Sequence, residues 1–264
     1  MNTATQTWHY GLVSEWWAHF NTDGPEIERY GRFVGAGQPA LDAGCGAGRL
    51  LLPWLRAGYD VDGADVSPDM LARCRERAQA DGLDPLLLAQ ALHELDPPRR
   101  YRTVVCCGVL GIGTTRAQDE EGLRRLHAAL EPGGILLLDN EVPYANARQW
   151  ATWTTQGRAA LPTALPQAGD RRTAPDGSEY ELRGRTLALD PLDQSVVMEM
   201  HVRKWVDAAL VAEEARAITV RMYFRDELVL MLERAGFRDV EVRGGFDERA
   251  PTPDDDTLVY VARS

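Results

Sequence analysis

The sequence predicts an α/β fold in which a parallel sheet ends in an antiparallel hairpin. Three observations support this class. A short apolar run leads into a glycine-rich turn at residues 39–48, strand-like runs then alternate with amphipathic helical patterns, and two strand-like runs follow the last helix. Because alternating strands and helices build parallel sheets, we expect a doubly wound core.

The glycine-rich turn is the most informative stretch. Residues 39–48 read Pro-Ala-Leu-Asp-Ala-Gly-Cys-Gly-Ala-Gly, and the apolar residues after them recur at helical spacing. Gly44, Gly46 and Gly48 allow positive φ and a close approach by a ligand. Free amides at the start of the following helix then face that ligand. Such a turn alone serves several cofactors.

Two acidic residues make the turn more specific. Asp42 stands where a dinucleotide-binding fingerprint carries glycine, and its carboxylate would repel a pyrophosphate but attract an ammonium or a sulfonium. Asp65 ends a second predicted strand, Val61–Asp65, 21 positions after Gly44 (65 minus 44). An acid about 20 residues after such a turn holds a ribose hydroxyl in nucleotide-binding folds. A helix cap is the alternative role for Asp65.

The two segments resemble motifs of the class I S-adenosylmethionine-dependent methyltransferases. Residues 42–48, Asp-Ala-Gly-Cys-Gly-Ala-Gly, are similar to the first motif of that family, and residues 61–71 are similar to the second. The resemblance implies S-adenosylmethionine as the cofactor. It also implies a Rossmann-like seven-stranded sheet with a terminal antiparallel hairpin, an N-terminal helical lid and an inserted small antiparallel sheet.

The resemblance also implies which residues bind the cofactor. Asp42 and the turn 44–46 would hold the methionine part, Asp65 would hold the ribose hydroxyls, and Val66 and Met70 would flank the adenine. The full predicted set is Asp42, Ala43, Gly44, Cys45, Gly46, Asp65, Val66, Met70, Gln90, Ala91, Leu92, Cys107 and Gly108.

Two positions depart from the family pattern. Gln90 stands where the family usually has an acid that accepts from the adenine amino group, although an amide oxygen can still accept. Arg102 replaces another acid that is common in the family. These departures leave open a non-catalytic S-adenosylmethionine-binding module. Asp42 and the closing hairpin count against a further alternative, a nicotinamide-dependent oxidoreductase.

The chain is expected to divide into four parts. They are an N-terminal helical lid (1–35), a cofactor-binding core (36–140), an inserted substrate-covering loop and antiparallel sheet (141–222), and the C-terminal part of the core (223–264). Three alternating runs, at 179–189, 194–205 and 210–219, predict the strands of the inserted sheet. The lid carries an aromatic stripe, for which plain packing onto the sheet is the alternative.

Methyl transfer depends mainly on positioning the nucleophile and excluding water, so no fixed catalytic triad is expected. A neutral amine needs no base in the transfer step, whereas a hydroxyl does. The candidate catalytic residues are Glu141, Tyr144, Tyr10 and His9. Substrate contacts are expected from Trp17, Leu110 and Tyr144. An ordinary loop role is the alternative for Glu141 and Tyr144.

Composition limits the partners. Among 264 residues, 40 acidic side chains face 29 basic ones, for a net charge of -11. Nucleic acid binding needs clustered Lys and Arg, so a small-molecule substrate is expected instead. No apolar run approaches the ~20 residues that span a membrane, and the N-terminus lacks a signal-peptide pattern. We therefore expect a cytoplasmic protein without a membrane partner.

The four cysteines show no metal-ligand spacing, so no metal site is expected. The inserted sheet and the aromatic cover resemble small-molecule methyltransferases, including amino-sugar N-methyltransferases and glycine N-methyltransferase. This analogy favours N-methylation of a natural product or metabolite over O- or C-methylation. A homodimer is left open.

Overall fold

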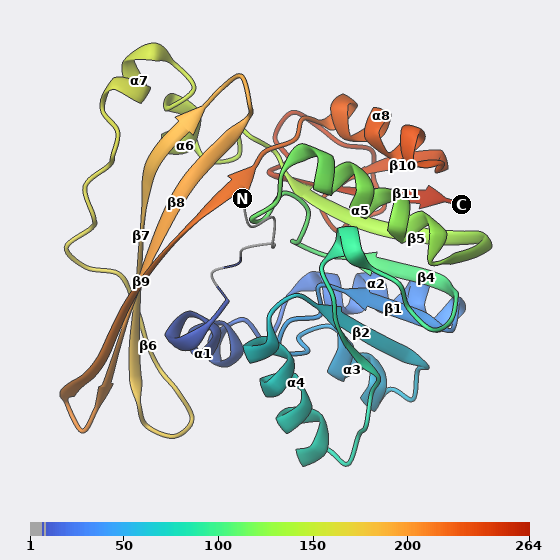
Figure 1. Ribbon diagram of the computed structural model, residues 1–264, viewed down its shortest axis with the longest axis horizontal. Coiled ribbons are helices and arrows are strands. Elements are labelled where there is room, and N and C mark those ends of the chain that lie inside the picture. Colours follow the sequence, from blue (N-terminus) through green and yellow to red (C-terminus); the bar gives the residue numbers. More distant parts are fainter. Residues whose placement is uncertain (1–6, 8) are drawn as a thin grey trace.

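The computed structural model describes residues 7 and 9–264. It contains a large sheet enclosed by helices and a second sheet that stands beside it (Figure 1). The large sheet has seven strands in the order β10-β11-β5-β4-β1-β2-β3, and the second has four in the order β6-β7-β8-β9. This architecture confirms the predicted fold class. Residues 1–6 and 8 of the expected lid lie outside the described residues.

The large sheet combines a parallel core with an antiparallel end. Its strands are β1 (Ala40–Ala43), β2 (Val61–Asp65), β3 (Leu87–Ala89), β4 (Tyr101–Cys106), β5 (Leu130–Glu141), β10 (Arg238–Gly244) and β11 (Thr257–Arg263). Strands β1 to β5 pair in parallel, whereas β11 runs antiparallel to both β5 and β10. The last two strands thus form the predicted closing hairpin.

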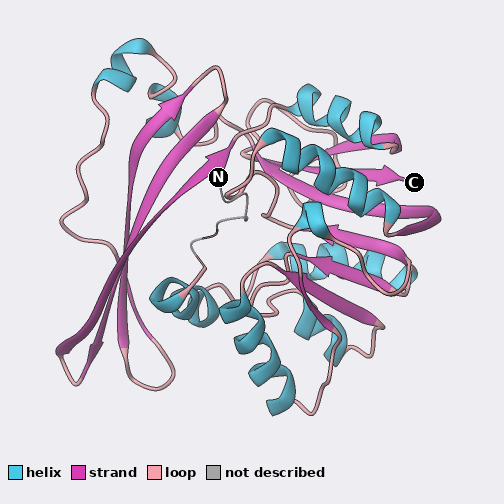
Figure 2. Ribbon diagram, in the orientation of Figure 1, coloured by secondary structure: helices cyan, strands magenta, loops and turns pink. Residues whose placement is uncertain are grey.

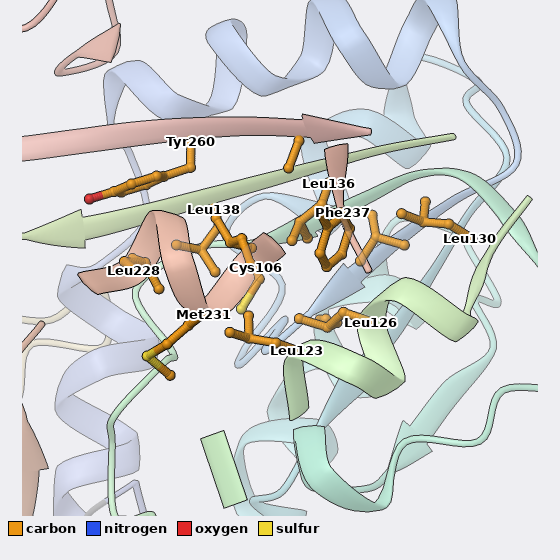
Figure 3. Close-up of a cluster of buried hydrophobic side chains, with 14 of the residues drawn as sticks. Cys106, Leu123, Leu126, Leu130, Leu136, Leu138, Leu228, Met231, Phe237 and Tyr260 are labelled. Atoms are coloured by element: carbon orange, nitrogen blue, oxygen red, sulfur yellow. The ribbon is translucent and has the colours of Figure 1, made fainter. Parts of the chain in front are cut away.

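Helices cover both faces of the large sheet. They are α2 (Pro25–Ala36), α3 (Leu51–Arg56), α4 (Pro68–Ala80), α5 (Arg116–Ala128) and α8 (Arg225–Ala235), with a 3-10 turn η1 at Leu92–Glu94. Figure 3 shows the core under α5 and α8, where Leu126 and Met231 face strand residues such as Leu138. A second buried cluster joins α2, α3 and α4 to the opposite face. Helices on both faces explain why the residues of β1 and β4 are buried almost without interruption.

Three element boundaries differ from the sequence-based expectation. Helix α5 begins three residues before the expected Asp119, because Thr115 and Gln118 form a capping box at its start. Strand β3 is limited to Leu87–Ala89, whereas residues 85–92 were expected. Strand β5 includes the Pro-Gly-Gly turn that was expected before it, and its register with β4 shifts there.

The second sheet lies between β5 and α8 in the sequence and has four strands, not the three that were predicted. They are β6 (Asp170–Thr173), β7 (Glu179–Asp190), β8 (Ser195–Val206) and β9 (Ala209–Arg221). Strand β6 was missed because its four residues are all exposed and carry no apolar alternation. Two short helices, α6 (Ala147–Ala151) and α7 (Thr155–Ala159), precede it.

Helix α1 (Gly11–Phe20) lies between the inserted sheet and α4 (Figure 2). Its buried residues Val13 and Trp16 pack in one cluster with Tyr180 of β7, Val202 of β8 and Ile218 of β9. The aromatic stripe of the lid therefore packs mainly on the inserted sheet. This packing fixes α1 at the end of the large sheet that carries the glycine turn.

Candidate active site

A cavity of about 320 Å³ lies at the carboxyl ends of the parallel strands. Ligands bind at this edge in open α/β sheets. The residues that line it come from the turns after β1 to β4, from the start of α5 and from the N-terminal segment. They are Thr7, His9, Trp17, Asn21, Asp42, Gly44, Cys45, Gly46, Ala47, Arg49, Leu50, Asp65, Val66, Met70, Gln90, Ala91, Leu92, Cys107, Gly108, Val109, Ile112, Thr114 and Asp119.

The glycine turn is fixed to the neighbouring strand. The Gly44 and Cys45 amides both donate to the Ala64 carbonyl, at 2.7 and 2.9 Å. Gly44 has φ +96°, and a Cβ on it would overlap Cγ2 of Val109. Only glycine therefore lets the loop after β4 approach the turn this closely.

Asp65 connects the turn to the start of α4. One carboxylate oxygen accepts from the Gly46 amide (2.9 Å), and the other accepts from the Ser67 amide (2.8 Å). Burial raises the pKa of Asp65, while these amide donors oppose the shift. The carboxylate thus has an ordered position at the cavity wall.

Asp42 is the least satisfied acid of the site. It is 1% exposed, and among the described residues its Oδ2 atom has no hydrogen-bond partner. Burial, reinforced by the charge of Asp65, raises the pKa of Asp42 to about 7. A buried carboxylate oxygen without a donor is costly unless a ligand satisfies it. The cavity beside Asp42 therefore suits a ligand that carries a positive charge or an N–H group.

Asp139, near the end of β5, fixes the position of the loop after β4. The Gly108 amide donates to Asp139 Oδ1 (2.7 Å), and the Tyr30 hydroxyl of α2 donates to Oδ2 (2.9 Å). Burial raises the pKa of Asp139, whereas these donors favour its charged form. Two layers of the fold thus hold Cys107 and Gly108 against the cavity.

The same loop continues to the inserted sheet. Ile112 forms a bridge with Val220 of β9, the Gly113 amide donates to the Thr219 carbonyl (2.8 Å), and the Arg221 amide donates to the Gly111 carbonyl (2.8 Å). The end of β9 therefore fixes the part of the cavity wall that Ile112 and Thr114 form.

The N-terminal segment covers the cavity from the other side. His9 and Trp17 both line it, with ring centroids 5.5 Å apart. The Ser67 hydroxyl donates to the His9 carbonyl (2.5 Å), and the Gly11 amide donates to Asp69 Oδ2 (2.8 Å). Burial lowers the pKa of His9 to about 4, so its imidazole is neutral at neutral pH.

The structure brings together almost all of the residues that were predicted to bind a cofactor. All of them line the cavity except Ala43, which is buried in β1. Trp17, a predicted substrate contact, and the candidate base His9 line it too. Gln90 also lines it, and one of the two lone pairs of its amide oxygen accepts from the Asp96 amide (3.1 Å).

Four other candidates are not among the residues that line the cavity, and their roles stay predictions. Glu141 is exposed and pairs with Thr257 of β11. Tyr144 is 43% exposed and packs against the Trp150 ring. Leu110 packs against the core under α5 and α8. Tyr10 is the N-cap residue of α1, and the guanidinium of Arg216 lies over its ring.

Sequence reasoning missed several lining residues. They include Asn21, Arg49, Ile112, Thr114 and Asp119. Thr114 and Asp119 flank the capping box of α5, and this sequence signal could have marked the start of a helix at a sheet edge. Arg49 pairs with Glu26, and its guanidinium lies 3.6 Å from the Cys107 sulfur.

Among residues 7 and 9–264, no helix is long and apolar enough to cross a membrane. The same residues contain no group of three or more His, Cys, Asp or Glu side chains that could hold a metal ion.

Residues 40–134 match a family model described as a methyltransferase domain. A putative methyltransferase of Geobacillus sp. (strain WCH70) is 24% identical over 247 residues, which cover 90% of this chain and 88% of the relative. Two solved structures share the fold. The sugar N-methyltransferase KedS8 from Streptoalloteichus sp ATCC 53650 has a TM-score of 0.70 and 18% identity, with all of both chains covered. The SAM-bound amino pentose methyltransferase CalS10 from Micromonospora echinaspora has a TM-score of 0.64 and 20% identity, with 96% and 97% covered.

The sheet order is that of an open α/β fold, and the glycine turn and the acids at the strand ends lie together at the cavity wall. Together with the methyltransferase domain match over residues 40–134, they support an S-adenosylmethionine-dependent methyltransferase. Its cofactor is S-adenosylmethionine. The nicotinamide-dependent alternative is thereby set aside.

Proposed function

We propose that this enzyme transfers the methyl group of S-adenosylmethionine to an amino nitrogen of a small molecule. The observation that carries the cofactor part of the proposal is the buried Asp42 Oδ2 atom at the cavity wall, which has no hydrogen-bond donor among the described residues. The amino group of the methionine part, or the sulfonium, would supply the missing positive partner.

The predicted residues offer a partner to each part of the cofactor. In this proposal Asp42 and the turn 44–46 hold the methionine part, and Asp65 accepts from the ribose hydroxyls. Val66 and Met70 lie beside the adenine. The remaining contacts would come from Gln90, Ala91, Leu92, Cys107 and Gly108. When bound, the cofactor supplies a carbon already activated for displacement, so the protein has to orient the acceptor and exclude water.

The charges of the cavity support an amine acceptor. The lining contains Asp42, Asp65 and Asp119, and Arg49 is the one Arg or Lys among its described residues. Arg49 is itself paired with Glu26. An anionic acceptor would therefore meet repulsion, whereas a protonated amine would be attracted. The two similar structures named for amino pentose methylation and sugar N-methylation agree with this preference.

Calorimetric titration tests the cofactor assignment directly. The protein should bind S-adenosylmethionine and S-adenosylhomocysteine but not a nicotinamide dinucleotide. Asp65→Ala should weaken S-adenosylmethionine binding by roughly 10-fold to 100-fold, since a hydrogen bond to a charged group contributes ~1.5 to 3 kcal/mol. Asp84→Ala, at an exposed position before β3, is the matched control. Unchanged affinity in a folded Asp65→Ala variant would remove Asp65 from the site.

Trp17 is the proposed acceptor contact within the lid. Its ring lines the cavity and packs against His9 and Trp16. A ring of this kind excludes water and attracts a cationic amine. Trp17→Ala should therefore raise the apparent binding constant of the acceptor more than that of the cofactor, and equal effects would contradict the assignment.

A further inference from the structure

A buried hydrogen-bond network ends at the cavity wall on the side of the inserted sheet. The Thr114 hydroxyl donates to Asp119 Oδ1 (2.6 Å), and the Tyr223 hydroxyl donates to Asp119 Oδ2 (2.5 Å). Thr114 and Asp119 line the cavity. Tyr223 is fully buried directly behind them, where the chain returns from β9 to α8.

The network determines what the Thr114 oxygen can do. A hydroxyl has one proton and two lone pairs, and the proton of Thr114 is committed to Asp119. The oxygen can therefore meet a ligand only as an acceptor. A ligand that satisfies it must bring an N–H or O–H donor, and a carboxylate cannot.

Asp119 is suited to receive a proton. It is 2% exposed, and burial raises its pKa although Thr114, Tyr223 and the Gly111 amide all donate to it. The positive charge of Arg221 acts in the opposite direction. A carboxylate held in this way is a stronger base than one in water.

We propose that Thr114, Asp119 and Tyr223 form the acceptor subsite, in which Thr114 binds the amine nucleophile and relays its proton to Asp119. This inference rests on the proposed methyl transfer to an amine. The acceptor binds as an ammonium, and one of its N–H bonds breaks as a new O–H bond forms to Thr114. The original hydroxyl proton of Thr114 passes to Asp119 at the same time, so Thr114 is unchanged and Asp119 becomes neutral. The amine retains the electron pair that methyl transfer requires.

The three residues have different tasks. Thr114 contacts the acceptor and is the specificity residue. Asp119 is the final proton acceptor. Tyr223 is a positioning residue, because its hydroxyl fixes Asp119 from behind and its ring is covered by Arg116, whose guanidinium carbon lies 5.3 Å from the ring centroid. The subsite thus joins the loop after β4, helix α5 and the end of the inserted sheet.

The first test is binding of three matched probes to the complex with S-adenosylhomocysteine. Glucosamine, glucose and glucuronate differ in carrying an amine, a neutral hydroxyl and an added carboxylate. Calorimetry should give the tightest binding for glucosamine. Thr114→Val, which keeps the shape but removes the acceptor oxygen, should weaken glucosamine binding roughly 10-fold, whereas Thr114→Ser should stay within threefold of the wild type.

The second test is methyl transfer from labelled S-adenosylmethionine to glucosamine. Thr114→Val should lower the rate roughly 100-fold, and Thr114→Ser should restore it. Tyr223→Phe should lower kcat but leave the KM for glucosamine within twofold, because its hydroxyl contacts Asp119 and not the amine. A merely structural role for Tyr223 would change kcat and KM together or unfold the variant.

The outcomes separate this inference from the proposed function. Every variant is also titrated with S-adenosylmethionine, whose affinity should not change. Failure of the wild type to bind S-adenosylmethionine would defeat both proposals. Intact cofactor binding with no preference for glucosamine, or with equal binding and rate in Thr114→Val, would overturn the acceptor subsite alone.

Discussion

The two halves of the cavity are built in different ways. The cofactor half comes from consecutive strand ends, and its bonds are local, such as that of the Gly44 amide to the Ala64 carbonyl. The acceptor half depends on distant segments: the Leu12 amide donates to Glu214 (2.8 Å) across 202 positions, and Tyr223 donates to Asp119 across 104. The cofactor half is thus a property of the core, whereas the acceptor half exists only when the inserted sheet is in place.

The largest effect should follow from adding a side chain to the glycine turn by the substitution Gly44→Ala. In Gly44→Ala the new Cβ meets Val109 in a left-handed conformation that costs about 1 to 2 kcal/mol by itself. The clash adds about 1 to 3 kcal/mol. We expect a loss of about 2 to 5 kcal/mol of stability and at least a 100-fold loss of cofactor affinity, measured by denaturation and calorimetry.

Gly58→Ala separates the backbone cost of a left-handed conformation from the cost of the clash with Val109. Gly58 has φ +82°, but no atom lies within 4 Å of the position that a Cβ would occupy, so only the backbone cost applies. Its cofactor affinity should be that of the wild type. Equal effects of the two substitutions would mean that the contact between the turn and Val109 is not needed for binding.

The second effect concerns Asp42 and depends on pH. The folded-state pKa is about 7, above the value of about 3.9 in an unfolded chain. The folded protein therefore holds a proton that the unfolded chain has already released, and stability falls as the pH rises from about 4 to 7. Asp42→Asn removes this cost, which reaches about 4 kcal/mol above pH 7.

Denaturation of Asp42→Asn and the wild type at a series of pH values measures this difference. We expect similar stability near pH 4 and a more stable variant at pH 8, where the variant should also bind S-adenosylmethionine less tightly because it lacks the negative charge. A difference that does not vary with pH would mean that Asp42 is ionised throughout. Burial of Asp42 would then cost the folded protein less stability than the geometry of the site indicates.

The difference between local and long-range contacts explains which site residues could be predicted from the sequence. The glycine turn and Asp65 were predictable because their partners are neighbours in the strand-turn-helix pattern. Glu141 was a candidate because it ends β5, but the structure pairs it with Thr257 of β11 and it is not among the lining residues. The capping box beside Asp119 could mark only a helix start, because the partner of Asp119, Tyr223, is brought to it by the inserted sheet from 104 positions away.

A third prediction concerns the hydrogen bond between Tyr30 of α2 and Asp139 of β5. Tyr30→Phe removes the hydroxyl that donates to buried Asp139 and should cost about 1 to 3 kcal/mol of stability. Tyr260→Phe is a matched control, since the hydroxyl of Tyr260 is also buried but has no hydrogen-bond partner among the described residues. The control should be neutral or slightly stabilising in the same denaturation experiment. Equal losses would show that ring packing, and not the bond to Asp139, stabilises the loop after β4.

The smallest effect is expected for Glu214→Ala, which should loosen the lid without changing the cofactor half. Glu214→Ala removes the carboxylate that accepts from the Leu12 amide in the first turn of α1. Losing one such bond costs about 1 kcal/mol, so hydrogen exchange at Leu12 should become roughly fivefold faster. Glu213→Ala is the control, because Glu213 pairs with Arg203 of β8 instead of α1. Cofactor affinity should change less than threefold in Glu214→Ala. A loss as large as that of Gly44→Ala would mean that the lid and the glycine turn form one cooperative unit. The two halves of the cavity would then not be distinct.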